Sequence, residues 1–439
     1  MLVSIHKPIL FLLLILLIGN SAKSQIMTLQ QCIDTALIHN KNLMMSRNQL
    51  ELSREKELEA VAGWYPKLNV NADYRYFIEL PYQLMPMSVF GGEEGKFKEA
   101  QFGVPHNMNA ALQFSMPLHQ PRLNSAIRSA RIGNEISGLQ YRKTTEQVVM
   151  EVTGLYYNAQ VLRSQLAFVE NNLGNNKKLL ANMQLLKEQL MATGTDVNKV
   201  SLQMEKLNTE LAQLQSYYQQ LLNKLKFTMG LSLDQVVHVN DSISFDPKDD
   251  YTLSPATDLE LSNAQGKLLF SEMNTLQSSN KPSLSLYGSY GIAGMGFDKS
   301  PNAFLNFYRT GFAGLQLTVP LFNGTVTNRK IKQKSLELQN NSLQQNLLEE
   351  KIQLEVINAR NQKTVAQHSV QTTRSQTRLA QSIYNQTLLL QKQGLSSLTD
   401  LLLADNNLQE AQQKHLAAMV DYLKADLDLK MVTGNILNK

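Results

Sequence analysis

The chain of 439 residues is 43% hydrophobic and 18% charged, with a formal net charge of +5 at pH 7. Its basic residues do not gather into a Lys/Arg-rich run, which argues against a nucleic-acid partner. A single cysteine, Cys32, excludes a disulfide within the chain. We expect Cys32 to be a buried helix residue, because no small residue precedes it as a lipoprotein signal would need.

Residues 1–24 have the pattern of a secretory signal peptide. Lys7 is followed by an apolar run from Ile9 to Ile18 and by small residues at Ala22 and Ser24. A run of about ten apolar residues is too short for an inner-membrane anchor, and no later stretch approaches the roughly 20 that a transmembrane helix needs. The mature chain is therefore predicted to leave the cytoplasm. If it enters a membrane, it must do so as strands.

The first structural repeat is expected over residues 25–230. A capping box at Thr28 and Gln31 begins a helix over 28–63. Two strands of alternating character follow at about 67–80 and 107–117, and then two helices at about 122–190 and 196–230. Because side chains of a strand alternate between faces, one face is predicted to be apolar and the other polar. The apolar face carries Val70, Tyr74, Leu112 and Phe114, and the polar face Asn69, Asp73, Gln113 and Ser115.

A polar linker or equatorial segment is expected over 231–256, and a second repeat over 257–439. That repeat comprises a helix over 257–279, strands at about 282–293 and 309–320, and helices at about 325–393 and 398–434. Leu286, Leu315 and Leu317 lie on the apolar strand face, opposite Gln316 and Thr318. Pro117 and Pro320 are separated by 203 residues, and Asp196 and Asp400 by 204. This near-constant offset indicates a duplicated strand-helix-helix unit. The first strand hairpin is longer than the second, and we expect the extra residues to lie outside the cell.

The helices that follow the strands are unusually long. About 70 residues at 1.5 Å each would extend about 100 Å. Heptad spacing from Val197 and from Leu401 favours coiled-coil packing. His415 falls in the second seam, where a packed or lumen-facing histidine is expected rather than a metal ligand.

Four strands cannot close a barrel, and lipid does not tolerate an open sheet edge. The chain must therefore associate: two copies would supply eight strands and three copies twelve. Eight strands barely leave an interior, whereas the polar face of these strands suits water. A trimer with twelve strands fits best, with the apolar face towards lipid and the polar face towards the lumen. The expected fold is mainly α, a long coiled-coil helical barrel joined to a membrane β-barrel.

In this duplicated arrangement the chain resembles the TolC family of outer-membrane efflux proteins. The resemblance rests on the order of Pro117-Leu118, Pro320-Leu321, Asp400-Leu401-Leu402 and Thr433-Gly434 over the whole mature chain. It implies a homotrimer in the cell outer membrane that extends into the periplasm. It also implies docking to a periplasmic adaptor (a membrane fusion protein) and an inner-membrane pump.

The resemblance further implies a periplasmic gate lined by acids, for which Asp196, Asp400 and Asp405 are the candidates. The chain departs from the family pattern at two places. Leu403 occupies the position of a second ring acid, and Leu190 stands where the second repeat has a glycine. We expect Gly194 to serve that turn instead.

The predicted function is a passive exit duct of a tripartite efflux or type I secretion system, gated at its periplasmic end. One alternative is a soluble periplasmic coiled-coil adaptor or scaffold, which would not need the four amphipathic strands. Another is a nutrient porin, which would not need about 100 Å of helix. The sequence contains no His-x3-His pair, nucleophile elbow or phosphate-binding glycine loop. Neither an enzyme activity nor a cofactor or metal is predicted.

Overall fold

The computed structural model describes residues 25–240, 243 and 251–437. The expected signal peptide, residues 1–24, lies outside this range. Two compact units are formed by interleaved segments: one comprises the described residues up to 50 with 137–263 and 344–437, the other residues 51–136 and 264–343. We call them the helical unit and the strand unit. The boundaries between these segments fall within the helices Lys41–Ala62, Pro121–Glu188, Thr257–Ser278 and Val326–Lys392.

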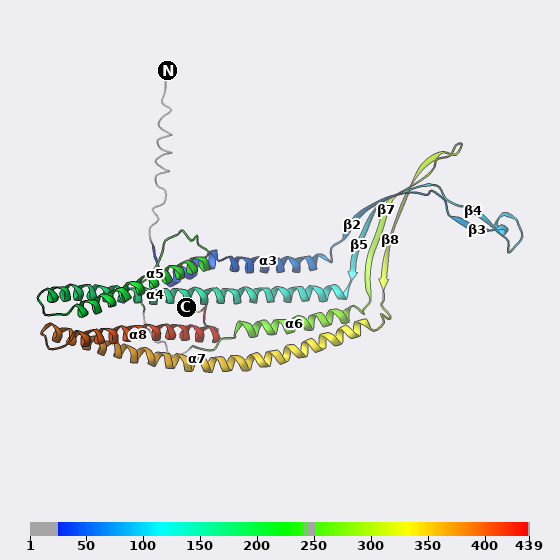
Figure 1. Ribbon diagram of the computed structural model, residues 1–439. Helices are drawn as coiled ribbons and strands as arrows, with labels where there is room; N and C mark the ends of the chain where they lie inside the picture. The colour runs from blue at the N-terminus through cyan, green and yellow to red at the C-terminus, as the bar shows by residue number, and fades with distance from the viewer. Residues whose placement is uncertain (1–24, 241–242, 244–250, 438–439) are drawn as a thin grey trace, which may run out of the picture. The chain divides into compact units, whose positions relative to one another are not determined.

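Figure 1 shows the helices and strands in chain order. The helices are α2 (Leu29–His39), α3 (Lys41–Ala62), α4 (Pro121–Glu188), α5 (Gly194–Met229), α6 (Thr257–Ser278), α7 (Val326–Lys392) and α8 (Leu398–Val432), with a short 3-10 helix η1 (Met87–Phe90). The strands are β1 (Gln25–Met27), β2 (Lys67–Tyr76), β3 (Tyr82–Pro86), β4 (Phe97–Gln101), β5 (His106–His119), β6 (Val237–Val239), β7 (Ser283–Phe297) and β8 (Phe304–Thr318). Among the described residues, no helix combines the length and the apolar character that crossing a bilayer requires.

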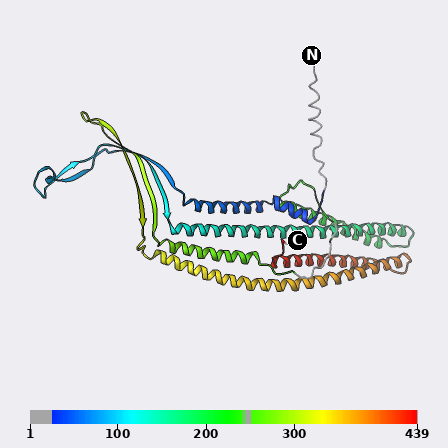
Figure 2. The same cartoon turned by 180° about the vertical axis from the view of Figure 1, so that it is seen from behind.

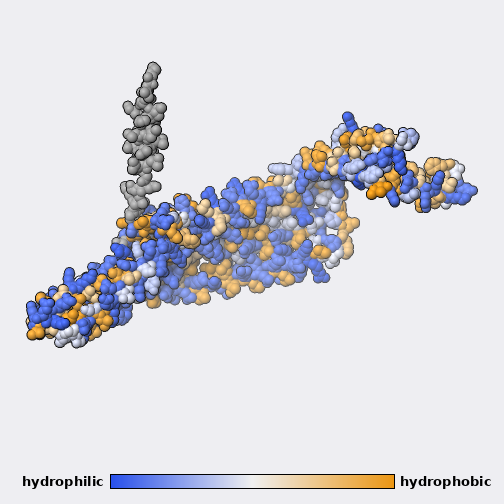
Figure 3. Space-filling view, turned by 45° about the horizontal axis from the view of Figure 1, so that its top comes forward, coloured by the Kyte–Doolittle hydropathy of each residue, from blue (hydrophilic) through white to orange (hydrophobic). Residues whose placement is uncertain are grey.

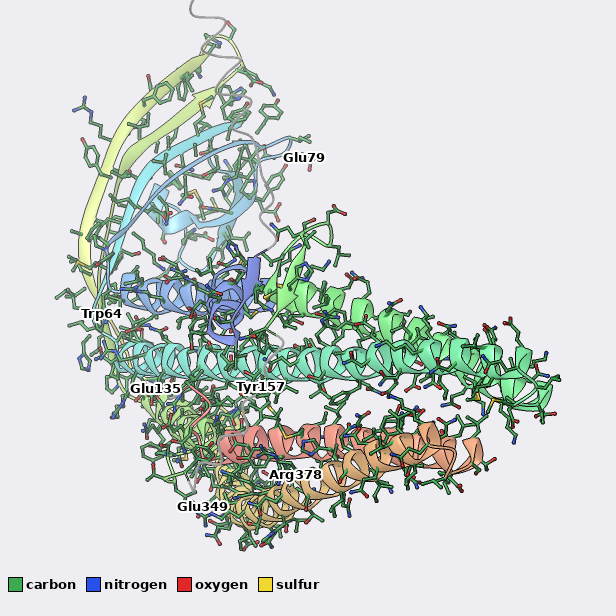
Figure 4. All side chains as sticks on the ribbon, turned by 90° about the vertical axis from the view of Figure 1, so that its left-hand side faces the viewer. Trp64, Glu79, Glu135, Tyr157, Glu349 and Arg378 are labelled. Carbon is green, nitrogen blue, oxygen red and sulfur yellow. The ribbon has the colours of Figure 1, made fainter. Side chains whose placement is uncertain are left out.

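The strand unit contains an antiparallel sheet of four strands in the order β2-β5-β7-β8. Figure 4 shows Trp64 where the chain leaves α3 and enters this sheet. The strand expected to end at Pro117 instead continues to His119, because a bulge at Leu118 restores the pairing with β7. β8, by contrast, ends at Thr318, two residues before Pro320. The four strands are otherwise those expected, with ends that differ by up to five residues.

A second hairpin occupies the loop between β2 and β5. β3 and β4 pair antiparallel, from Tyr82 opposite Gln101 to Pro86 opposite Phe97, and η1 forms their turn. Gly91 ends η1 with a φ of 78°, which a residue without Cβ adopts readily. The extra length of the first strand hairpin is therefore an ordered arm. Its large apolar side chains are exposed, and Figure 3 shows orange patches on this part of the surface.

The first helix expected over 28–63 is two helices, because Asn40 interrupts it. Asn40 has an extended backbone with φ −64° and ψ 122°. Its side-chain oxygen accepts a hydrogen bond from the backbone N–H of Leu43 at 3.0 Å and so caps α3. Its side-chain amide donates to the carbonyl of Thr228 at 2.7 Å. Asn40 thus redirects the chain and ties it to the end of α5.

The helical unit consists mainly of two helical hairpins. α4 packs with α5, and α7 with α8, and the members of each pair lie side by side in Figures 1 and 2. The seam of the first hairpin buries Leu166, Val169, Leu173, Leu207 and Leu214. Two of these, Leu207 and Leu214, lie on the heptad spacing of the sequence. The second seam buries Ala418, Tyr422 and Ala425 at the corresponding spacing.

A further core lies where α2, α4 and α5 meet two short strands. β6 falls in the expected linker and pairs parallel with β1, from Gln25 opposite Val237 to Met27 opposite Val239. The fully buried Cys32 belongs to this core, as the sequence predicted. Burial raises the pKa of its thiol to about 12. Tyr157, labelled in Figure 4, packs against this core from α4.

Candidate functional site

The register of the four-stranded sheet decides which side chains share a face, because directly opposed residues point the same way. Val70 is opposite Leu112, and Leu112 is opposite Tyr290. One residue along, Asn69 is opposite Gln113, and Gln113 is opposite Ser289. Every candidate from the apolar set therefore lies on one face: Val70, Tyr74, Leu112, Phe114, Leu286, Leu315 and Leu317. Every candidate from the polar set lies on the other: Asn69, Asp73, Gln113, Ser115, Gln316 and Thr318.

The two faces differ in chemistry but neither is uniform. Val70, Leu315 and Leu317 on the apolar face are largely exposed in the single chain. The polar face includes an aromatic pair, Tyr287 and Phe312, whose ring centroids are 5.8 Å apart. β2 and β8 are the outer strands of this sheet, and each pairs with one neighbour only in the described chain. A second strand could pair with each outer edge.

The turns at the ends of the two helical hairpins have the same pattern of backbone hydrogen bonds. In the α4–α5 turn, the N–H of Met191 donates to Leu186 O at 2.8 Å and that of Leu190 to Lys187 O at 3.0 Å. In the α7–α8 turn, Leu395 donates to Leu390 O at 2.9 Å and Gly394 to Gln391 O at 3.0 Å. Each of these residues is 204 positions after its counterpart.

Leu190, and not Gly194 as expected, serves as the left-handed residue of the first turn. Its φ is 58°, and the φ of Gly394 is 73°. A Cβ makes this conformation unfavourable for leucine. Leu190 is 93% exposed, so packing of its side chain does not compensate for the strain. The hydrogen bonds of the turn impose the conformation.

Asp196 and Asp400 occupy equivalent places just after these turns: each is the third residue of its helix and closes a capping box with the N-cap residue, Thr193 or Ser397. Asp196 Oδ2 accepts from the backbone N–H of Thr193 at 3.2 Å and from its hydroxyl at 2.7 Å. Asp400 Oδ2 accepts from Ser397 in the same way, at 3.1 and 2.7 Å. Hydrogen bonds from the Thr193 and Ser397 side chains, and then from their backbones, hold the pKa of each carboxyl below its usual range. Both acids are therefore ionised at neutral pH.

The two turns of one chain lie next to each other. Lys199 forms an ion pair of 3.7 Å with Asp196 and donates to Thr399 Oγ1 at 3.4 Å, which connects α5 to the start of α8. A groove of about 580 Å³ lies between the turns and is lined by both of them, including Asp196 and Gly394. The charged residues of its lining are one acid, Asp196, and one base, Lys392, and Asp400 lies outside the lining.

Asp405 differs from the other two acids, although the sequence grouped all three. Its side chain is only 5% exposed and accepts hydrogen bonds from Asn176 on α4 at 3.2 Å and from Gln409 at 2.9 Å. Burial raises the pKa of Asp405, and these two hydrogen bonds lower it in part. In this chain Asp405 joins α8 to α4 and is not part of the groove lining.

His415 is a packed residue of the second seam. Its Nδ1 lies 3.1 Å from the hydroxyl of Thr373 on α7. Burial and the nearby Arg374 lower its pKa. Within the described part of the chain, no three His, Cys, Asp or Glu side chains are grouped as a metal site would need.

Three residues that shape the site were not singled out from the sequence as site residues. Lys199 bridges the two turns, Asn176 holds Asp405, and Leu190 takes the strained turn position. The capping boxes Thr193-x-x-Asp196 and Ser397-x-x-Asp400 could have been found from their spacing alone. Nothing local to the sequence marks Asn176, because its partner is 229 residues away.

Comparison with known proteins supports this fold. The family model described as "Outer membrane efflux protein" matches residues 32–231 and 252–435. A search among curated proteins found no match. Among solved structures, the outer membrane protein VceC of Vibrio cholerae is similar with a TM-score of 0.72 at 16% identity, covering 92% of this chain and 96% of that one. The CmeC outer membrane channel of Campylobacter jejuni gives 0.74 at 14% identity, covering 93% and 85%. The open state of the MtrE outer membrane channel of Neisseria gonorrhoeae gives 0.68 at 17%, covering 93% and 89%.

Proposed function

This chain belongs to the outer membrane efflux protein family, and from that premise we propose that three copies assemble into one channel with a gate at its periplasmic end. The protein is an outer-membrane exit duct of efflux systems that extends into the periplasm; it is neither an enzyme nor a soluble adaptor.

The observation that supports the trimer is the sheet whose two outer strands, β2 and β8, each pair with one neighbour only among the described residues. In a bilayer the outer edges of β2 and β8 would leave backbone N–H and C=O groups without partners, at a cost of several kcal/mol each. Pairing β2 of one copy with β8 of the next satisfies both edges. Three copies give twelve strands, an even number within the range of bacterial barrels, whose lumen is wide enough for water.

The same closure assigns the two faces of the sheet. Leu112, Leu315 and the other members of the apolar set would face lipid, where exposed apolar side chains are stable. Gln113, Gln316 and the other members of the polar set would face a water-filled lumen. The side chains of Tyr287 and Phe312 would then form a pair of aromatic rings that line the lumen within the membrane.

The gate is proposed at the turns of the helical hairpins. Three copies would bring six turns together, each with an ionised acid close behind it. Asp196 and Asp400 would attract cations and repel one another across a narrow opening. A periplasmic adaptor would favour the open state to the extent that it binds that state more tightly than the closed one. The inner-membrane pump would supply the energy and select the cargo.

Reconstitution tests this proposal. We expect the purified protein to give the native mass of a trimer and discrete conductance steps in planar bilayers. We also expect it to fractionate with the outer membrane. A monomer or dimer in native mass spectrometry would contradict the twelve-stranded closure. A trimer that forms no pore would contradict the channel assignment.

A further inference from the structure

A cavity of about 650 Å³ lies inside the strand unit, between the beginnings of α4 and α7 and the end of α6. Its wall includes Arg122 from α4 and Lys330 and Lys334 from α7. None of the interactions described above uses this cavity. Its position is distinctive, because all three helices connect directly to strands of the four-stranded sheet at this end.

The two segments that lead from strands into α4 and α7 carry charge of one sign, and the single acid in the cavity wall is Glu272 of α6, against the three cations Arg122, Lys330 and Lys334. Residues 116–134 and 318–336 contain seven basic side chains and no acidic one: Arg122, Arg128, Arg131, Arg329, Lys330, Lys332 and Lys334. Neither α4 nor α7 has an acid in its first turn, so the positive ends of both helix dipoles remain uncompensated there. The cavity therefore has a positive potential.

Two of the lining cations are available to a ligand. Lys334 is occupied, since it pairs with Glu272 at 2.8 Å and with Glu337 at 2.7 Å. Arg122 and Lys330 are exposed and have no carboxylate partner among the described residues. The hydroxyls of Thr275 and Ser279 in the wall already donate to backbone carbonyls at 2.9 and 2.6 Å. Binding of an anion thus depends on Arg122 and Lys330.

The apolar strand face ends where the chain leaves the sheet for the helices that line this cavity. Leu284 and Leu317 are opposite each other near the ends of β7 and β8, and Leu284 is also opposite His119, the last residue of β5. Arg122 is three residues beyond His119. Lys330 is in the second turn of α7, about 6 Å along the axis from its first residue. Along the chain, the apolar strand residues are therefore followed within a short distance by cations without a carboxylate partner. A phospholipid has the same order of groups, because its apolar acyl chains are followed by a phosphate.

We propose that Arg122 and Lys330 bind a phosphate-bearing anion, the headgroup of an anionic phospholipid in the leaflet that faces the periplasm. This inference rests on the proposed function, because it requires the apolar strand face to contact lipid down to Leu284 and Leu317. The arginine can bind the phosphate through two N–H groups, while the lysine acts as a point charge. Such a lipid would hold the strand ends at a fixed depth in the membrane.

The test uses the full-length protein, purified in a nonionic detergent and titrated with phosphatidylglycerol. Phosphatidylcholine and inorganic phosphate are the comparison ligands, and binding is measured by native mass spectrometry. The variant Arg122→Gln/Lys330→Gln removes both cations. The matched control Lys177→Gln/Lys178→Gln removes two exposed cations from the part of the same helix α4 that belongs to the helical unit.

We expect the wild-type protein and the Lys177/Lys178 control to bind phosphatidylglycerol alike, in preference to phosphatidylcholine. Arg122→Gln/Lys330→Gln should bind phosphatidylglycerol about thirtyfold more weakly, the factor expected for two cations near a membrane surface. Equal binding by both variants would overturn the site. Inorganic phosphate that competes as tightly as the lipid would overturn the lipid as ligand and indicate a soluble anion.

The oligomer and its conductance are measured on the same preparations. A conducting trimer without the lipid difference would refute this site alone. Failure to form a conducting trimer would refute the proposed function.

Discussion

The side-chain amide of Asn176 donates a hydrogen bond of 3.2 Å to the buried carboxylate of Asp405 and so links α4 to α8. The other atom of that amide, Asn176 Oδ1, is buried and has no hydrogen-bond partner among the described residues. No cation contributes to the pKa shift of Asp405. A buried charge supported by two neutral amides is less stable than a neutral group in the same place.

We predict that Asp405→Asn stabilises the protein at pH 7, by about 1 kcal/mol, because an amide at 405 can donate to Asn176 Oδ1 and carries no charge. The effect should depend on pH. Burial raises the folded-state pKa of Asp405 above its ordinary value of 3.8, so the folded state binds more protons than the unfolded state. The wild-type protein should therefore lose stability as pH rises from 3.8 through the folded pKa, and Asp405→Asn should not lose this contribution.

Thermal unfolding of both proteins between pH 4 and pH 7 measures this difference. The gap in Tm should widen as pH rises. Asp405→Leu is the control, since it leaves the amide nitrogen of Asn176 with the carbonyl of Asn172 as its remaining acceptor and should cost about 1–3 kcal/mol. A gap that is constant with pH would show that Asp405 carries no buried charge.

Leu190→Gly is expected to stabilise the α4–α5 turn by about 0.5–1 kcal/mol, because relief of the left-handed strain exceeds the entropy that glycine loses on folding. The duplicated turn provides the matched control. Gly394→Leu should destabilise the α7–α8 turn, since it introduces the same strain. The rate of amide hydrogen exchange at each turn measures the effect of the substitution there. Slower exchange after Gly394→Leu would be incompatible with this account.

Leu112→Arg is expected to impair assembly, because it places a charge on the face proposed to contact lipid, where arginine costs about 2–4 kcal/mol near the bilayer midplane. Gln113→Arg, the neighbouring residue on the opposite face, is the control and should assemble normally. The yield of trimer from outer membranes measures both. If Gln113→Arg were the defective variant, the two faces would be assigned the wrong way round.

Asp400→Asn and Asp196→Asn are expected to weaken cation block of the channel, because each copy in the trimer would lose one anionic group at the constriction. Asp400→Glu is the control: it keeps the charge and remains a good third residue for the capping box. Single-channel recordings with added divalent cations provide the measurement. Block that is unchanged in the double variant Asp196→Asn/Asp400→Asn would remove both acids from the gate.

The strand faces could be predicted from the sequence because their physical basis is local. Side chains alternate along a strand, so the pattern around Leu112 and Gln113 assigns faces before any partner is known. Antiparallel pairing then aligns like with like across the sheet, as Val70 and Leu112 show. The long helices were predictable for the same reason, since a heptad is a local period.

The remaining features depend on contacts that a local pattern does not contain. Asn40 ends α2 because its amide reaches Thr228, 188 residues away. The spacing of Asp405 from the turn does not reveal whether its side chain is exposed or buried. That depends on the packing of α8 against α4, where Asn176 lies. The left-handed position of the first turn was wrongly assigned to Gly194 and not to Leu190, because glycine preference predicts where such a residue is easy, and not where hydrogen bonds enforce one. The extra length of the first hairpin was predicted, but its pairing into β3 and β4 was not.

Cys32 has a practical consequence for experiments on this channel. Its side chain has no exposed surface, and its thiol remains protonated at neutral pH, so it reacts poorly with alkylating reagents. A cysteine placed on an exposed strand or turn would then be the reactive thiol of each subunit, without removal of the native one. Spin labels introduced in this way, one position at a time, would give the distances between neighbouring copies and follow the hairpin ends as the duct opens.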